Sequence, residues 1–269
     1  MPSWMNVGLA LSLTLALAPT PAEAQKGALR GALERRRAAR QADGGLDDGA
    51  DAPGRATIPA NVRVVHDVAY GPDSKQRFDV YVPAGAASAP VVFIVHGGGW
   101  RTGDKAGRAV VENKVAHWSR AGAIVISVNY RLLPDAGPLE QARDVARALA
   151  AAQTRLATWG GDPARVVLVG HSAGAHLVAL LDADPALATS LGAKPWLGTI
   201  ILDSAVLDVP TFMSHPHLPL YTRAFGSDTA YWRAASPYEH VNSGMNPMLV
   251  VCSSERRDSC PAAMRFVAK

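Results

Sequence analysis

The stretch VVLVGHSAGAHLVALL, Val166–Leu181, decides the fold, because an apolar run gives way to a helical pattern at a serine between two glycines. The run before Gly170 predicts a strand buried on both faces of a sheet, and the residues after Ser172 have helical spacing. The pentapeptide GHSAG, 170–174, therefore fits the pattern G-x-S-x-G in the setting that this pattern requires. A sharp strand-to-helix turn strains the backbone of the serine and projects its hydroxyl above the sheet. We therefore predict that Ser172 is a nucleophile; the alternative is a glycine-lined turn with an incidental serine.

The rest of the chain alternates predicted strands with predicted helices. A long stretch of helical spacing, 137–161, ends in a glycine pair, as helices often do. Buried strands are expected within residues 89–100, 123–132, 197–206 and 246–254, after a hairpin or two edge strands within 61–83. This alternation predicts an α/β protein with a mostly parallel, doubly wound sheet and helices on both faces, in one domain over 61–269. Asp208–Tyr238, rich in Pro, His and aromatic residues, is expected to be an irregular insertion over one end of the sheet.

The N-terminal residues predict export. Val7–Ala18 is an apolar run too short to span a bilayer comfortably, and Ala22–Ala24 supplies small residues where a signal peptidase cuts. We predict a signal peptide over 1–24, a flexible basic and Gly/Asp-rich leader over 25–60, and a secreted or periplasmic protein without an integral membrane span. No Lys or Arg precedes the apolar run, so the alternative is an apolar helix that docks on the domain.

Composition excludes several classes of protein. The chain has 269 residues, of which 48% are hydrophobic, and this is enough for one large domain. A net charge of +4 would suit a polyanion, but much of the basic excess lies in Arg30–Gln41, so we expect no nucleic-acid partner. The two cysteines, Cys252 and Cys260, match no zinc-binding spacing, and we expect no metal site. They form either a small disulfide loop or two unrelated thiols.

The stretch HGGGW, 96–100, follows one of the predicted buried strands. Three consecutive glycines let the backbone approach a substrate and aim its N–H groups into a pocket, as a developing oxyanion requires. We predict that the amides of Gly98, Gly99 and Ala173 form an oxyanion hole. The same glycines begin a near match to a phosphate-binding loop. Asp104 stands where that motif needs its lysine, and an acid there repels phosphate.

Four stretches resemble a known family: HGGGWRTGDK, SVNYRLLP, GGDPARVVLVGHSAGAHL and SPYEHV. They resemble α/β-hydrolase esterases of the hormone-sensitive-lipase and feruloyl-esterase-like carboxylesterase group, and they are also similar to kynurenine formamidases. The resemblance covers about Val62–Lys269. It implies a serine hydrolase that acts on a small-molecule ester and uses no cofactor.

The resemblance also implies where the catalytic acid lies. In this family the acid follows a late strand, and NPMLVVCSSERRDSCP places it at Asp258. Glu255 is the alternative, because the loop does not have the usual length. Asp203 and Asp208, after the preceding predicted strand, are weaker candidates.

The catalytic histidine is where the resemblance breaks. The eight histidines are His66, His96, His117, His171, His176, His215, His217 and His240. None follows Asp258, so the family order of serine, acid and histidine is not completed. AAMRFVAK, 262–269, predicts the opening of a helix, after which the family has a last strand and then the histidine. We therefore expect the fold to lack its last elements here, and the base to lie beyond Lys269.

Three histidines from the insertion remain alternatives for the base, namely His215, His217 and His240, and His96 is expected to shape its loop. Removing the base of a serine hydrolase costs orders of magnitude in turnover. We therefore expect the 269-residue chain alone to hydrolyse p-nitrophenyl acetate little faster than buffer does.

Together these observations predict a serine carboxylic ester hydrolase that forms an acyl-enzyme on Ser172. An amidase or arylformamidase of the same fold is one alternative, and a catalytically impaired binding protein is another. Six aromatic residues are expected either to shape the acyl or alcohol pocket or to pack in the core: Trp100, Phe212, Tyr221, Phe225, Tyr231 and Trp232.

Overall fold

The structure is a computed structural model that describes residues 56–204, 206–254, 256 and 258–269, all within one compact unit, Asp43–Lys269. The predicted signal peptide (1–24), most of the predicted leader (25–60) and Glu255 lie outside the described residues.

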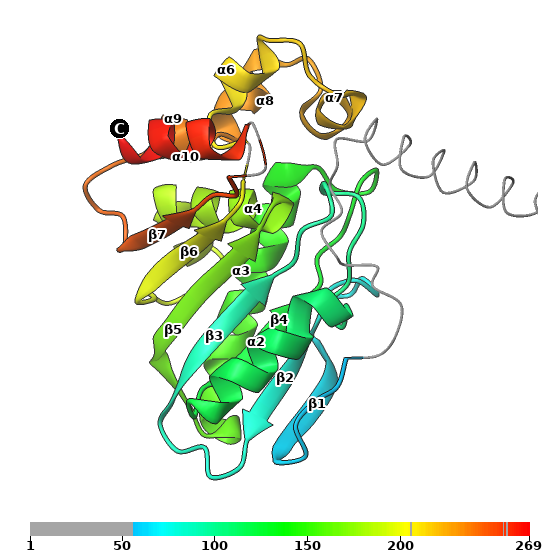
Figure 1. The fold of residues 1–269 in the computed structure, drawn as a ribbon, viewed down its shortest axis with the longest axis vertical. Helices are drawn as coiled ribbons and strands as arrows, with labels where there is room; N and C mark the ends of the chain where they lie inside the picture. The colour runs from blue at the N-terminus through cyan, green and yellow to red at the C-terminus, as the bar shows by residue number, and fades with distance from the viewer. Residues whose placement is uncertain (1–55, 205, 255, 257) are drawn as a thin grey trace, which may run out of the picture. The chain divides into compact units, whose positions relative to one another are not determined.

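A seven-stranded sheet forms the centre of the described residues, in the order β1-β2-β4-β3-β5-β6-β7 (Figure 1). Its strands are β1 (Val62–Ala69), β2 (Arg77–Pro83), β3 (Ala89–Val95), β4 (Ile124–Val128), β5 (Gly161–His171), β6 (Gly198–Leu202) and β7 (Met248–Val251). Strand β2 runs antiparallel to both of its neighbours, and the other four pairs are parallel. The prediction of a hairpin followed by a parallel sheet is confirmed.

Helices cover both faces of this sheet, as predicted. On β3, Phe93 belongs to one core cluster, whereas its neighbours Val92 and Ile94 belong to another, so the two clusters lie on opposite faces. Helices α3 (Pro138–Arg155) and α4 (Ala173–Ala183) pack into the first cluster, and α2 (Arg108–Arg120) packs into the second (Figure 1). The central strands read as continuous apolar runs because both of their faces are buried.

The insertion predicted to be irregular is helical, so that prediction was wrong. Its helices are α6 (Val209–Met213), α7 (Pro219–Phe225), α8 (Thr229–Ala234) and α9 (Pro237–His240). The Asp208 side chain accepts a hydrogen bond from the Thr211 amide at 3.1 Å, and the Asp228 side chain accepts one from the Ala230 amide at 2.9 Å. These aspartates cap α6 and α8, whereas α6, α7 and α9 have a proline in the first turn. Helices this short do not repeat often enough to show a periodic pattern.

The other helices of the described residues are η1 (Leu156–Trp159), α5 (Pro185–Thr189) and α10 (Ser259–Val267). Helix α10 confirms the helix predicted from AAMRFVAK. Within the described part of the chain, none of the helices has the length and apolar character needed to cross a bilayer.

The predicted site residues meet at one edge of the sheet. The carboxyl ends of parallel strands share an edge, and this is where open α/β sheets bind ligands. The HGGGW loop follows β3, Ser172 follows β5, Asp203 follows β6, and the loop with Asp258 follows β7. The topology therefore brings together residues that are more than 150 positions apart in the sequence.

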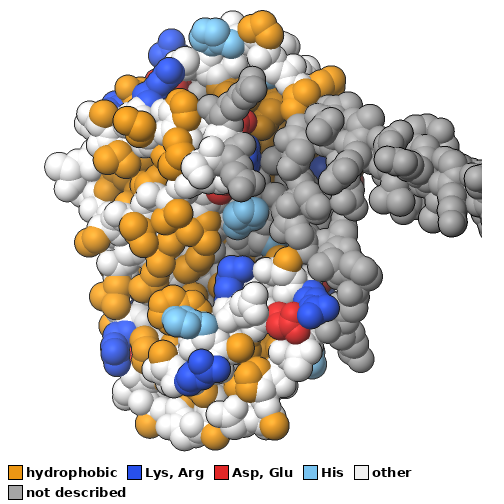
Figure 2. Space-filling model, viewed as in Figure 1, with side chains coloured by type: hydrophobic (Ala, Val, Ile, Leu, Met, Phe, Trp, Pro, Cys, Tyr) orange, Lys and Arg blue, Asp and Glu red, His pale blue; other side chains and the backbone are white. Residues whose placement is uncertain are grey.

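One face of the sheet becomes exposed toward β7. Strand pairing aligns Val169, Ile200 and Leu249 in one row, on the face that α2 covers farther along the sheet. Val169 is 7% exposed, whereas Leu249 is 56% exposed. Figure 2 shows hydrophobic side chains gathered over the part of the sheet where these strands lie.

Candidate active site

Ser172 occupies a strained turn between β5 and α4. Its φ of 51° and ψ of −116° are rare for a residue with a side chain, and the residue is 6% exposed. A Cβ on Gly170 would lie 2.3 Å from the Gly174 carbonyl oxygen, and one on Gly174 would lie 2.3 Å from the Val95 oxygen. Both flanking glycines are therefore needed for the strand, the turn and the helix to approach this closely.

The neighbouring strands fix this turn. The Ser172 amide donates a hydrogen bond of 2.8 Å to the carbonyl oxygen of Leu202, the last residue of β6. Val95, which the Gly174 backbone touches, is the last residue of β3. The nucleophile candidate thus lies at the junction of three strand ends.

The glycines that follow β3 adopt backbone conformations that few other residues tolerate. Gly98 has a φ of 114° and Gly99 a φ of 58°, both in the left-handed region that glycine tolerates. A Cβ on Gly98 would lie 2.1 Å from the Thr102 carbonyl oxygen. Among the described residues, the amides of Gly98, Gly99 and Ala173 have no hydrogen-bond acceptor. Three N–H groups without a described acceptor therefore lie in the segments that follow β3 and β5.

The buried side chain of His96 contacts the glycine loop that it precedes. It is 1% exposed, its ring stacks on Tyr130 with centroids 4.6 Å apart, and its Nδ1 lies 2.7 Å from the Gly97 carbonyl oxygen. The Tyr130 hydroxyl donates to the His96 carbonyl oxygen at 2.8 Å. Burial lowers the pKa of His96. The expected loop-shaping role agrees with this packing.

A buried ion pair, which the sequence analysis missed, anchors the far end of the same loop. The Lys105 Nζ lies 2.8 Å from a carboxylate oxygen of Asp79, whose side chain is fully buried in β2. The Lys105 amide donates to Asn129 Oδ1 at 2.6 Å, and Asn129 Nδ2 donates to Asp104 at 2.8 Å. Asp104, which argued against a phosphate-binding loop, thus takes part in fixing the loop.

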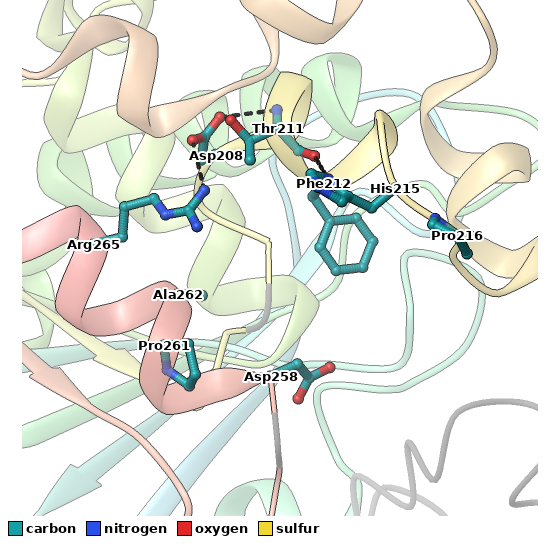
Figure 3. A pocket seen from close by; sticks show the side chains of 9 residues that line it. All are labelled: Asp208, Thr211, Phe212, His215, Pro216, Asp258, Pro261, Ala262 and Arg265. Carbon is teal, nitrogen blue, oxygen red and sulfur yellow. Dashed lines mark hydrogen bonds and ion pairs between the residues drawn. The ribbon is translucent and has the colours of Figure 1, made fainter.

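The loop between β7 and α10 carries the predicted acid and is closed by a disulfide. Cys252 and Cys260 are bonded, so the question that their spacing left open is answered. Asp258 lies at the N-terminal end of α10 and lines a cavity of about 260 Å³ between α6 and α10 (Figure 3). Phe212 and the Asp208–Arg265 ion pair, at 3.6 Å, line the same cavity. Asp203 follows β6 and contacts this loop.

Comparison with known proteins agrees with this architecture. Residues 78–192 match the BD-FAE family. The esterase LipQ of Mycobacterium tuberculosis is 30% identical over 213 residues, which cover 73% of this chain and 50% of LipQ. Esterase B of Lactobacillus rhamnosis has a similar structure, with a TM-score of 0.68 at 22% identity, over 90% of this chain and 81% of that one. The chain has the α/β-hydrolase fold.

A further relative is a rice (Oryza sativa) protein named a probable isoprenylcysteine alpha-carbonyl methylesterase. It is 35% identical over 118 residues, which cover 44% of this chain and 27% of the rice protein. The chain thus spans half or less of the length of these two curated relatives. These relatives and the structural neighbour named above are esterases, which confirms the resemblance that the sequence motifs indicated.

The three insertion histidines make hydrogen bonds to carbonyl oxygens close to them in the sequence. His215 Nδ1 lies 2.8 Å from the Thr211 carbonyl oxygen, His217 Nδ1 lies 2.6 Å from the His215 oxygen, and His240 Nε2 lies 3.3 Å from the Ala234 oxygen. All eight histidines are among the described residues, and none of them makes a hydrogen bond to Ser172. The structure therefore does not bring any of these histidines to the serine hydroxyl.

The predicted pocket aromatics divide between the core and the cavity. Trp100, Tyr221 and Phe225 are at most 5% exposed and pack in the core, with centroids 5.0 Å apart for Trp100 and Phe225. Phe212 is half-buried and lines the cavity (Figure 3), and the centroid of its ring lies 4.5 Å from that of Tyr221. Tyr231 instead accepts a hydrogen bond from the Leu139 amide, at the start of α3.

Proposed function

We propose that this hydrolase cleaves carboxylic esters through an acyl-enzyme on Ser172. The observation that carries the proposal is the strained Ser172 turn, together with three backbone amides that have no acceptor among the described residues, those of Gly98, Gly99 and Ala173. Its relatives named above are esterases, which supports the same reaction class.

The mechanism follows from this arrangement. The Ser172 hydroxyl attacks the ester carbonyl carbon, and the carbonyl oxygen becomes an oxyanion that the three amides stabilise. One such donor lowers the barrier by about 3 kcal/mol. The base takes the proton of the Ser172 hydroxyl and gives it to the leaving alcohol. The same base then takes a proton from water, which attacks the acyl group; the Ser172 oxygen leaves with that proton, and the carboxylic acid is released.

The base is a histidine in this proposal, oriented by Asp258. None of the eight histidines of residues 1–269 reaches Ser172, so we propose that the base lies outside these residues. The relatives, which are longer than this chain, leave room for such a segment. Reading the encoding frame past Lys269 for a strand followed by a histidine tests this part directly.

To test the reaction itself, imidazole is added in solution to replace the proposed histidine base. We expect the 269-residue chain to hydrolyse p-nitrophenyl acetate little faster than buffer, and added imidazole to raise the rate above the rate of imidazole alone. The increment should vanish in Ser172→Ala, and a fluorophosphonate probe should label the wild-type chain but not this variant. An imidazole increment that is the same in both proteins would sink the proposal.

The same assay separates esters from amides. An N-formyl aryl amide, measured beside short-chain p-nitrophenyl esters, should turn over far more slowly than the esters. Faster Ser172-dependent cleavage of the formyl amide would replace the esterase by an arylformamidase of the same apparatus.

We also propose that the protein is secreted or periplasmic, with residues 1–24 as its signal peptide. The Cys252–Cys260 disulfide supports this, because disulfides persist in oxidising compartments. Fractionation of the native host and N-terminal sequencing test it. A cytoplasmic protein that retains Met1 would contradict it.

A further inference from the structure

Arg256 connects two carboxylates inside the disulfide-closed loop. Its Nη1 lies 3.3 Å from Asp203 Oδ2 and donates to the Asp203 carbonyl oxygen at 3.2 Å. Its Nε and Nη2 lie 3.3 and 3.4 Å from the two carboxylate oxygens of Asp258. The guanidinium thus contacts Asp258 with two donors and Asp203 with a third, which only a planar fork can do.

Hydrogen bonds to neighbouring segments hold Asp203 in place. It directly follows β6, and its amide donates to the Val251 carbonyl oxygen of β7 at 2.7 Å. The residue before it, Leu202, accepts the hydrogen bond from the Ser172 amide. Its φ of 58° is strained for an aspartate, and its Oδ1 accepts a hydrogen bond from the Ser253 amide at 2.9 Å.

The ionisation state of Asp203 suits an ion pair with Arg256. Burial by itself raises the pKa of Asp203, but its hydrogen bonds and the nearby Arg256 outweigh burial, and the pKa lies below its usual value. Asp203 therefore stays ionised opposite Arg256 at neutral pH.

The Asp258 carboxylate, in contrast, has few contacts besides those with Arg256. Its side chain is 46% exposed, and among the described residues the only side chain that contacts its carboxylate is Arg256. The disulfide fixes the two ends of the loop, Cys252 and Cys260, but it does not fix the rotation of the Asp258 side chain.

We propose that Arg256 is a positioning residue that fixes the Asp258 carboxylate against Asp203, and through it against the strand end that holds Ser172. The inference rests on the proposed function, in which Asp258 is the catalytic acid. Arg256 touches no reacting atom; it acts by orienting the group that orients the base.

The test compares Arg256→Ala, Arg256→Lys and the control Arg108→Ala in the full 269-residue protein. Arg108 also pairs with a carboxylate, that of Glu112, and both residues of this pair belong to α2. Imidazole-supported hydrolysis of p-nitrophenyl acetate should fall about tenfold to hundredfold in kcat for Arg256→Ala, the scale expected for a misplaced catalytic group. KM should stay within about twofold, Arg256→Lys should recover part of the loss, and Arg108→Ala should match the wild type.

Hydrogen exchange of the amides in residues 252–260 is a second measurement, which reports how firmly the loop is held. Arg256→Ala should accelerate exchange at Ser253 and its neighbours, whereas Arg108→Ala should leave it unchanged. In a double-mutant cycle, Asp203→Asn combined with Arg256→Ala should lower kcat no further than Arg256→Ala alone, because both changes break one connection.

The outcomes separate this inference from the function on which it rests. Faster exchange with an unchanged kcat would show that Arg256 only stabilises the loop, and unchanged exchange would show that it does not hold the loop; either result overturns the proposal. If the wild-type chain has no Ser172-dependent turnover with imidazole, the proposed function itself fails, and the role of Arg256 falls with it.

Discussion

At the scale of single residues, the turn at Ser172 depends on backbone contacts that leave no room for side chains. Gly174 lies inside α4, where replacing glycine by alanine at an open position stabilises a helix by about 1 kcal/mol. Here the added Cβ would lie 2.3 Å from the Val95 carbonyl oxygen and 2.4 Å from that of His96. Because of this steric conflict, replacing Gly174 by alanine should destabilise the protein, whereas the same replacement at an open helix position stabilises it.

We predict that Gly174→Ala lowers the free energy of unfolding by about 1–3 kcal/mol, the usual range for overpacking. Urea denaturation followed by circular dichroism measures it. Gly122→Ala is a useful control, because its Cβ meets open space and only its φ of 80° opposes the change. A Gly174→Ala variant more stable than the wild type would contradict the tight strand-to-helix contact.

His176 gives a residue-scale prediction about pH. It is fully buried, and burial lowers its pKa from the usual 6.5 to about 4, although Nε2 donates to the Ala235 carbonyl oxygen at 2.8 Å. The folded state therefore binds a proton less readily than the unfolded chain. Its contribution to stability is complete above pH 6.5 and is lost as the pH falls toward 4, by about 3 kcal/mol.

His176→Gln can keep the donor to Ala235 but removes the titrating group. The variant should therefore lose stability less steeply than the wild type between pH 6.5 and 4, when unfolding free energies are measured by urea denaturation across that range. His96, which is also buried with a lowered pKa, remains in both proteins and contributes a common background. Parallel pH curves for the two proteins would show that His176 does not titrate as described.

At the scale of secondary-structure elements, the disulfide fastens the end of β7 to the start of α10. Cys252 follows the strand directly, and Cys260 is the second residue of the helix. Closing so short a loop stabilises the folded state by about 2–3 kcal/mol, mostly by restricting the unfolded chain. We predict that dithiothreitol lowers the free energy of unfolding by this amount. The Cys252→Ser/Cys260→Ser variant should already have the lower stability and should not respond to the reductant; an equal response in both proteins would contradict the assignment.

The elements differ in how far the sequence predicted them. Strands such as β3 and β5 were predictable because burial on both faces demands uninterrupted apolar runs, and the Ser172 turn because its two glycines stand at a fixed spacing. The insertion helices were not predictable, because four to seven residues with aspartate caps and early prolines carry little periodic signal. The contact between Asp203 and Arg256 joins residues 53 positions apart, and no local pattern encodes it.

At the scale of the whole molecule, the described sheet ends in an edge strand whose outer face is apolar. Within the described residues β7 pairs with β6 alone, and its four residues, Met248–Val251, include neither a charge nor a proline. Natural proteins usually place lysine, proline or a bulge on such strands to prevent edge-to-edge pairing. The exposed fractions of Leu249 and Val251 are 56% and 43%. Unpaired backbone groups and exposed apolar side chains therefore coincide on one strand.

We predict that the 269-residue protein self-associates as its concentration rises, because pairing at β7 would satisfy these backbone groups and bury the apolar row. Sedimentation velocity over a concentration series measures the association, and Leu249→Lys should shift the protein toward the monomer by placing a charge in the row. Met264→Lys is the matched control, since Met264 is 73% exposed on α10 and lies on no strand edge. A wild-type protein that stays monomeric throughout the series, or one in which both lysine variants act alike, would show that this strand does not drive association.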